Sequence, residues 1–144
     1  MYMTSADFFA GLLPHAPPMR LVEEVVECRP GEFARGRRTA RPTDWYFQGH
    51  FPGDPVVPAI VLVELLAQTG GIAAASGGAN PSALRVAAFT GFKFPNPARP
   101  HAVLEAAARV AGRMGGIVKV EGEVTADGVR VAAGAVILAE APAR

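Results

Sequence analysis

The sequence contains almost no cysteine and no long hydrophobic segment. Cys28 is the only cysteine among the 144 residues, which excludes an intramolecular disulfide and a cysteine-based zinc site within this chain. We expect Cys28 to be a small, buried, apolar side chain. The longest apolar runs, 56–63 and 131–139, are far shorter than the roughly 18 residues that a membrane-spanning helix needs. No transmembrane helix is therefore predicted.

A strong charge of either sign is also missing. The 14 lysines and arginines balance 13 aspartates and glutamates, and the formal net charge is +1. This balance does not favour a nucleic acid as a partner. No lysine or arginine precedes Arg20, and Asp7 lies where a signal peptide would be apolar. We therefore expect a cytoplasmic protein that binds neither nucleic acid nor a membrane.

The sequence does contain a regular series of apolar segments separated by glycine and proline, which predicts one globular domain spanning residues 1–144. The segment 4–13 has a capping residue followed by apolar residues at helical spacing, and it predicts a short helix. Asp127-Gly128 predicts a two-residue type I′ turn between two strands. Six strands are predicted altogether, over 20–28, 32–41, 84–94, 102–112, 117–126 and 129–139.

The segment 59–75 predicts a longer helix that is apolar nearly all round. Its only polar side chains are Glu64, Gln68 and Thr69, and a helix of this kind belongs inside a core. Consecutive hairpins favour antiparallel pairing of the strands. The predicted fold is therefore of the α+β class, with an antiparallel six-stranded sheet wrapped around a central buried helix. Because such a sheet leaves open edges, we expect two copies to pair as a two-fold dimer.

Glu64 is a carboxylate in the middle of this apolar helix. Burial disfavours the ionised form, so it would raise the pKa of Glu64 and could keep the acid protonated near neutral pH. A protonated carboxyl group is what a general acid requires. The alternative is a structural carboxylate, or one that faces a dimer interface. A second functional group has to decide between these hypotheses.

His50 lies just before the helix, in a segment, 48–55, whose two glycines and two prolines predict a compact loop. A single histidine in a loop is usually structural. His15 and His101, each beside a proline in an expected loop, are still weaker candidates for catalysis. His50 is therefore the histidine that we consider as a base near the helix start.

The helix start itself offers backbone donors. Pro58 suits the first helical turn, so the N–H groups of Ala59 and Ile60 lack partners within the helix and carry the positive end of its dipole. These amides could hold an oxyanion. Together with an imidazole base and a buried carboxylic acid, they match the removal of a proton next to a carbonyl with loss of a β-substituent.

A family signature is visible in the segment 47–59, FQGHFPGDPVVPA, and in the ELLAQ that follows at 64–68. These residues closely resemble the β-hydroxyacyl-acyl-carrier-protein dehydratases of fatty-acid synthesis, which are hotdog-fold enzymes. His50 and Glu64 have the spacing of that family's catalytic pair, and a glutamate is typical of its non-isomerising branch. Three further segments resemble the family, namely 13–15, 21–22 and 92–95.

The resemblance implies a dehydratase mechanism without metal or cofactor. His50 is then the base at the α-carbon, and Glu64 from the opposite subunit of a homodimer is the acid that protonates the departing hydroxyl. The substrate is a (3R)-hydroxyacyl thioester of acyl carrier protein or coenzyme A, and the product is the trans-2-enoyl thioester. Four further residues have implied binding or supporting roles: Ala59 through its N–H on the thioester carbonyl, Val56 through its carbonyl on the His50 ring, Gln68 beside Glu64, and Phe51 at the substrate.

Two positions depart from the family pattern. The family's usual glycine at the helix start is Ala59 here, which keeps the N–H and adds a methyl group. The Pro-Gly-Asp turn that usually follows the strand at Phe92 is replaced by Ala98-Arg99-Pro100. The acyl chain, the pathway and any assembly beyond the dimer stay open.

Two other functions on the same fold also stay open. In a thioesterase, Glu64 would activate water against the thioester carbonyl and release a free thiol, although His50 at the family position argues for the dehydratase. A non-catalytic acyl-binding subunit would be expected to lack one member of the pair, and neither is missing. Four basic residues either meet an acidic carrier protein or are simply solvated: Arg35, Arg37, Arg38 and Lys93.

Overall fold

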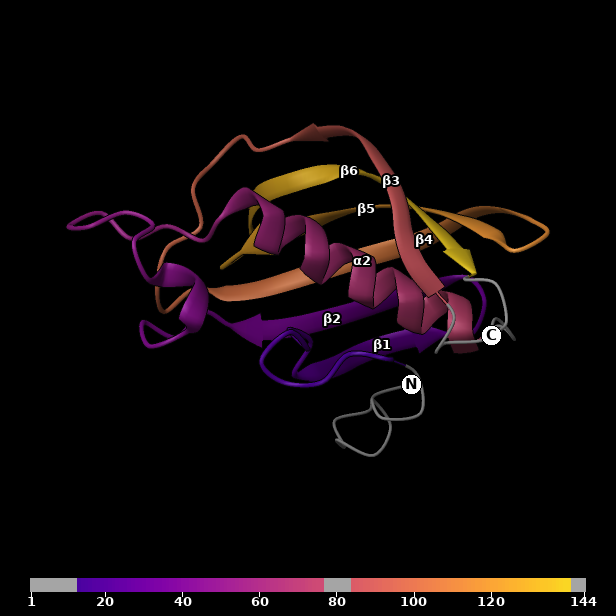
Figure 1. The fold of residues 1–144 in the computed structure, drawn as a ribbon, viewed down its shortest axis with the longest axis horizontal. Helices are drawn as coiled ribbons and strands as arrows, with labels where there is room; N and C mark the ends of the chain where they lie inside the picture. The colour runs from indigo at the N-terminus through magenta and orange to yellow at the C-terminus, as the bar shows by residue number, and fades with distance from the viewer. Residues whose placement is uncertain (1–12, 77–83, 141–144) are drawn as a thin grey trace.

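The computed structural model describes residues 13–76 and 84–140. Within them, six antiparallel strands form one sheet in the order β1-β2-β4-β5-β6-β3 (Figure 1). The predicted short helix over 4–13 lies, except for its last residue, outside the described residues. The elements are β1 (Glu24–Arg29), β2 (Phe33–Thr39), the 3-10 helix η1 (Trp45–Phe47), α2 (Ala59–Ser76), β3 (Leu84–Lys93), β4 (Val103–Met114), β5 (Ile117–Ala126) and β6 (Val129–Glu140).

The sheet curves around α2, which runs along its inner face (Figure 1). From Val61 to Ala75 every residue of α2 except Glu64 is buried, so the prediction of a helix inside the core is confirmed. Cys28 is also buried, as expected. The largest fully buried apolar side chains come from α2, from the sheet and from the segment before β1: Leu21, Val22, Val25, Leu65, Leu66, Ile72, Leu104, Val120, Val124, Val131 and Val136.

The helix lies so close to the sheet that one position of α2 requires glycine. A Cβ atom added at Gly70 would lie 2.7 Å from a methyl carbon of Val120 in β5. Glycine in a helix interior costs about 0.5–1 kcal/mol relative to alanine. The close contact between helix and sheet accounts for a glycine at this position.

The strand boundaries follow the predicted segments with one informative shift. The strand predicted over 20–28 begins at Glu24; ahead of it, the backbone N–H of Leu21 donates to the side chain of Gln68 at 2.8 Å and not to a neighbouring strand. The hairpin prediction at the other end of the chain is confirmed. Asp127 and Gly128 have φ values of 48° and 86°, as a type I′ turn requires.

Two of the four candidate basic residues form ion pairs across the sheet. Arg35 and Arg37 in β2 each approach Glu105 in β4 at 3.0 Å. Such partly exposed pairs contribute little stability, typically about 0–1 kcal/mol each. Glu27 and Glu24 also pair with Arg35 and Arg37, so carboxylates offset the positive charge of this part of β2.

Candidate active site

Glu64 is held by two neighbours through one of its oxygens. Its Oε1 lies 3.1 Å from His15 Nε2 and accepts a hydrogen bond from Gln68 Nε2 at 3.0 Å. Gln68 is 1% exposed; its Nε2 also donates to the carbonyl of Met19 at 2.7 Å, and its Oε1 accepts from Leu21. With both ends of its amide in use, Gln68 fixes the position of the Glu64 carboxyl group.

The pKa of Glu64 is lowered overall, so the expectation of a raised pKa was wrong. Burial does raise the pKa of Glu64, but the hydrogen bonds from His15 and Gln68 and the charge interaction with His15 together outweigh it. Hydrogen bonds donated to a carboxylate favour its ionised form. Gln68, four residues further along the helix, was expected beside Glu64, but the helix pattern gave no sign of the donor from His15.

His15, which the sequence made a weaker candidate than His50, contacts Glu64 directly. It lies with Glu64 in a cavity of about 440 Å³, lined mainly by apolar residues of the segment before β1, of α2, of β3 and of β6. A histidine beside a proline gave no reason to expect this position. The only signal was that 13–15 belongs to a segment that resembles the dehydratases.

His50 is oriented by its own loop. Its Nδ1 lies 3.1 Å from the carbonyl oxygen of Val56, and its ring stacks on Phe51 with 4.2 Å between the ring centroids. Only a protonated Nδ1 can donate to a carbonyl oxygen, so this contact assigns the hydrogen to Nδ1 and leaves the Nε2 lone pair able to accept a proton. Gly49 and Gly53 have φ values of 79° and 78°, which glycine adopts without strain.

The start of α2 presents the two expected backbone donors. Pro58 precedes the helix rather than lying in its first turn, since its carbonyl accepts the N–H of Val61 at 2.9 Å. The N–H groups of Ala59 and Ile60 have no hydrogen-bond partner among the described residues. Both residues are exposed. The helix dipole is therefore accessible from solvent at this end.

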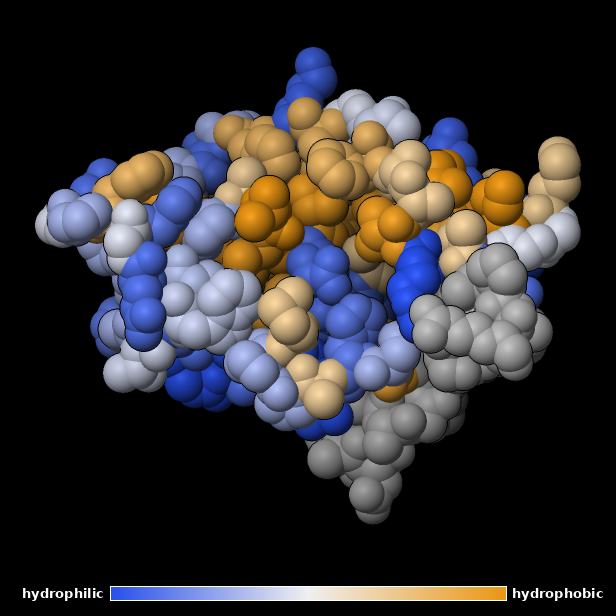
Figure 2. Space-filling model, in the orientation of Figure 1, coloured by the Kyte–Doolittle hydropathy of each residue, from blue (hydrophilic) through white to orange (hydrophobic). Residues whose placement is uncertain are grey.

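A single chain does not bring His50 and Glu64 into contact. His50 is absent from the described residues that line the Glu64 cavity, and its own contacts are with Val56 and Phe51. Apolar side chains are exposed nearby: Figure 2 shows them gathered around the start of α2 and over β3, beside a polar area. Ile60 is 75% exposed and Phe89 56% exposed. Gathered apolar side chains at such exposure are typical of interaction surfaces.

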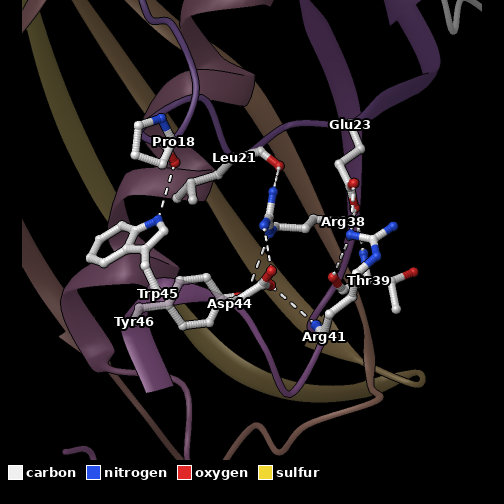
Figure 3. Close-up of polar contacts among 9 residues, drawn as sticks. All are labelled: Pro18, Leu21, Glu23, Arg38, Thr39, Arg41, Asp44, Trp45 and Tyr46. Carbon is white, nitrogen blue, oxygen red and sulfur yellow. Dashed lines mark hydrogen bonds and ion pairs between the residues drawn. The ribbon is translucent and has the colours of Figure 1, made fainter. Parts of the chain in front are cut away.

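A polar network joins β2 to η1, the short helix that leads into the His50 loop (Figure 3). Arg38 contacts Asp44 at 3.0 Å, the hydroxyl of Tyr46 at 3.4 Å and the carbonyl of Leu21 at 3.2 Å. Tyr46 donates to Asp44 at 2.7 Å. Burial, together with this donation to Asp44, raises the pKa of Tyr46 to about 12, so the phenol stays neutral. The network ties the loop to the sheet and to the segment before β1.

We expect Asp44→Asn to lower the free energy of unfolding by about 3 kcal/mol, because it leaves the charge of Arg38 without its counter-ion. The two side chains are only 10% and 12% exposed. The matched control is Asp54→Asn, which breaks an exposed pair with Arg99 and is expected to cost less than about 1 kcal/mol. Urea unfolding of both variants measures the difference. Equal losses would show that the Asp44 network is no more important than a surface ion pair.

The comparison with known proteins decides the family. Residues 13–135 match the family model described as a FabA-like domain. The chain belongs to the FabA-like domain family. It is 37% identical over 132 residues to the 3-hydroxyacyl-[acyl-carrier-protein] dehydratase FabZ of Nitratidesulfovibrio vulgaris (strain DSM 19637 / Miyazaki F), covering 85% of this chain and 86% of that protein. It is 35% identical over 138 residues to FabZ of Roseiflexus castenholzii (strain DSM 13941 / HLO8), covering 95% and 96%.

Solved structures confirm the hotdog fold for this FabA-like chain. The dehydratase heterocomplex ApeI:P from Xenorhabdus doucetiae superposes with a TM-score of 0.79 at 16% identity, covering 94% of this chain and 91% of that one. The E. coli PaaI protein superposes with a TM-score of 0.64 at 17% identity, covering 81% of each chain. At such low identity the likeness concerns the fold alone.

The segment 98–100, where this FabA-like chain departs from the family's Pro-Gly-Asp turn, contacts the His50 loop and the chain that leads into α2. Ala98 is buried, and its carbonyl accepts the N–H of Val57 at 2.8 Å. Arg99 contacts Asp54 of the His50 loop at 2.6 Å. The segment 98–100 thus braces the loop and the chain that leads into α2.

Neither a metal centre nor a membrane span is found in the part of the chain that the structure describes. Over 13–76 and 84–140, no group of three or more His, Cys, Asp and Glu side chains is placed to hold a metal ion. No helix in these ranges is long and apolar enough to cross a membrane.

Proposed function

We propose that this member of the FabA-like domain family dehydrates a (3R)-hydroxyacyl thioester carried on acyl carrier protein to the trans-2-enoyl thioester of fatty-acid synthesis. Its FabZ relatives carry the name of this activity and match over most of the chain. The observation that carries the proposal is the Glu64 carboxyl group, held by two hydrogen bonds at a mainly apolar cavity that suits an acyl chain. His50 supplies the complementary base.

In the proposed reaction, His50 Nε2 removes a proton from the α-carbon, and the electron pair moves into the thioester carbonyl. The N–H of Ala59 binds the oxygen that becomes negative. The carbonyl then re-forms, a double bond forms between the α- and β-carbons, and the bond to the β-hydroxyl breaks. Glu64 gives that hydroxyl a proton, so one water leaves. Transfer of the proton from His50 back to Glu64 through solvent restores both residues.

The active unit that we propose is a two-fold homodimer with His50 from one subunit and Glu64 from the other. In its support, the edge strand β3 has eight exposed residues out of ten, and an open edge of this kind is suited to pairing with a second copy. His50 and Glu64 do not meet within one chain. A partner that covers the cavity would also exclude water from Glu64 and shift its pKa upward, towards the protonated acid.

The shared site predicts complementation between inactive variants. Mixing His50→Ala with Glu64→Gln subunits is expected to restore about a quarter of the wild-type activity, because half of randomly paired dimers are mixed and each has one intact site. Turnover after refolding the mixture measures this. The control is a mixture of two differently tagged His50→Ala preparations, which stays inactive. If mass spectrometry demonstrates mixed dimers and activity does not return, the two residues do not share a site.

The function itself is tested with purified protein and 3-hydroxyacyl thioesters of several chain lengths, on carrier protein and on coenzyme A. Absorbance of the enoyl thioester and the loss of one water by mass are the expected results. A thioesterase is the second candidate, since the lowered pKa of Glu64 favours the ionised form that would activate water. Free thiol, detected with a thiol-reactive dye, would identify it. Thioester binding without either product would indicate a non-catalytic subunit.

The preference for carrier protein over coenzyme A follows from the names of the relatives and is measured in the same assay. The cytoplasmic location stays a prediction from the sequence.

Phe51, stacked on His50 and 54% exposed, is proposed to contact the substrate beside the base.

A further inference from the structure

The contacts of Glu64 are unequal between its two oxygens. Both His15 Nε2 and Gln68 Nε2 approach Oε1, at 3.1 and 3.0 Å. In the described part of the chain, no hydrogen bond or ion pair involves Oε2. The carboxyl group therefore has one anchored oxygen and one that is available to a ligand in the cavity.

The amide of Gln68 can only donate to Glu64. Its Oε1 accepts the backbone N–H of Leu21, and one hydrogen of Nε2 is given to the carbonyl of Met19. Reversing the amide would place two donors against the Leu21 N–H and an acceptor against the Met19 carbonyl, so the hydrogen-bond network fixes its orientation. The second Nε2 hydrogen points to Glu64 Oε1.

The surroundings of Nδ1 decide which nitrogen of the His15 ring carries the hydrogen. Its Nδ1 is buried and has no hydrogen-bond partner among residues 13–76 and 84–140. A hydrogen on Nδ1 would be a buried donor without an acceptor in the described part of the chain, which is unfavourable. The hydrogen of the neutral ring is therefore on Nε2, where Glu64 Oε1 accepts it.

We propose that His15 is a positioning residue for the dehydration: its Nε2–H and the amide of Gln68 together hold Oε1 of Glu64, so that Oε2 is the oxygen that carries the proton and delivers it to the departing hydroxyl. An oxygen that already accepts two hydrogen bonds has little capacity left for a proton of its own. This inference rests on the proposed dehydratase function and assigns within it the roles of a third side chain and of one particular oxygen atom.

The electrostatics of the cavity agree with this role. Among the described residues, the titratable or charged side chains that line it with Glu64 are His15, from the segment before β1, and Arg85 from β3. Apart from Gln68, the other described lining residues are apolar or glycine. The donor from His15 is among the causes that lower the pKa of Glu64. Removing it is expected to raise the pKa of Glu64.

Two amide substitutions test whether a donor at the position of Nε2 is sufficient, or whether the imidazole ring itself is needed. In His15→Gln the side-chain amide reaches about as far as Nε2, so it can still donate to Glu64. In His15→Asn the amide is at the position of Nδ1, where the described residues offer no acceptor. We expect turnover of His15→Gln to stay within about threefold of the wild type. His15→Asn is expected to lose about ten- to a hundredfold in the pH-independent limit of kcat, as misplacement of a reacting group does.

The pH profile gives a second readout that a purely structural role would not move. Glu64 acts as the protonated acid, so kcat/KM falls as pH rises through its pKa. In His15→Asn the pKa of Glu64 is expected to rise and this alkaline limb to move to higher pH. In His15→Gln the limb stays near its wild-type position. Carbon-13 NMR titration of the side-chain carboxyl groups, with Glu64 assigned by comparison with Glu64→Gln, measures the same pKa without any substrate.

The outcomes distinguish this inference from the proposed function. Equal losses in His15→Gln and His15→Asn, or a Glu64 titration that His15→Asn leaves unchanged, would overturn the positioning role even if the wild type is an active dehydratase. Wild-type protein that does not dehydrate any thioester would refute the function, while the NMR titration would still report whether His15 donates to Glu64. Melting curves of both variants establish that they are folded.

Discussion

Glu64→Gln is expected to lower kcat for dehydration by about 10²- to 10⁴-fold, the usual contribution of a general acid. The amide has the shape of the carboxyl group, and its oxygen can accept the same hydrogen bonds from His15 and Gln68 that the structure gives to Oε1. It has no acidic proton to give to a departing hydroxyl. The measurement is kcat and KM for a 3-hydroxyacyl thioester, with a smaller change expected in KM.

A matched control separates the loss of the acid from the loss of a carboxylate in general. Glu121→Gln removes an exposed carboxylate that pairs with Arg109 on the sheet, and we expect its kcat to equal that of the wild type. Thermal melting of both variants checks that they are folded. A folded Glu64→Gln protein with near-normal turnover would remove Glu64 from the mechanism.

The sequence predicted most of the fold because its hydrophobic pattern is strong where the structure is buried. The helix expected over 59–75 is Ala59–Ser76, and from Val61 to Ala75 all of its residues except Glu64 are buried. The strands over 117–126 and 129–139 match β5 and β6 to within a residue. Their boundaries are fixed by the Asp127-Gly128 turn, a local signal that needs no tertiary information.

The contacts of the candidate site could be predicted only in part, because they depend on segments far apart in the sequence. The His50 contact with Val56 lies within one short loop, and the family signature implies it. The contact of His15 with Glu64 crosses from the segment before β1 to α2, and no pattern in either segment indicates it. The same long-range contact lowers the pKa of Glu64, which is why burial alone gave the wrong direction.

The ends of the predicted elements show the same limit. The segment 20–23 is as rich in apolar residues as a strand, yet Leu21 donates its N–H to Gln68 and the strand begins at Glu24. A buried side-chain amide therefore replaced the pairing that β-propensity predicts. Gln68 thus binds both the segment before β1 and the Glu64 carboxyl group. These two contacts account for a buried amide in the apolar helix.

Ala59→Pro is expected to lower kcat by about 10²- to 10³-fold, as the loss of an oxyanion donor does. The N–H of Ala59 has no partner among the described residues, so proline at this first helical position removes no intrahelical hydrogen bond and the fold is expected to survive. If this N–H binds the developing enolate oxygen, its removal raises the barrier to reaction more than it weakens substrate binding. The measurement is kcat and KM for the same thioester used with Glu64→Gln.

The control for this prediction is Ala59→Gly, which keeps the N–H and removes only the methyl group, and we expect its kcat to change little. A proline also restrains the residue before it, and Pro58 is close to the loop that orients His50 through Val56. Thermal melting and the oligomeric state of both variants therefore accompany the kinetics. If a well-folded Ala59→Pro dimer dehydrates at the wild-type rate, the thioester carbonyl is bound elsewhere, because the only group lost at the helix start is the one assigned to hold its oxygen.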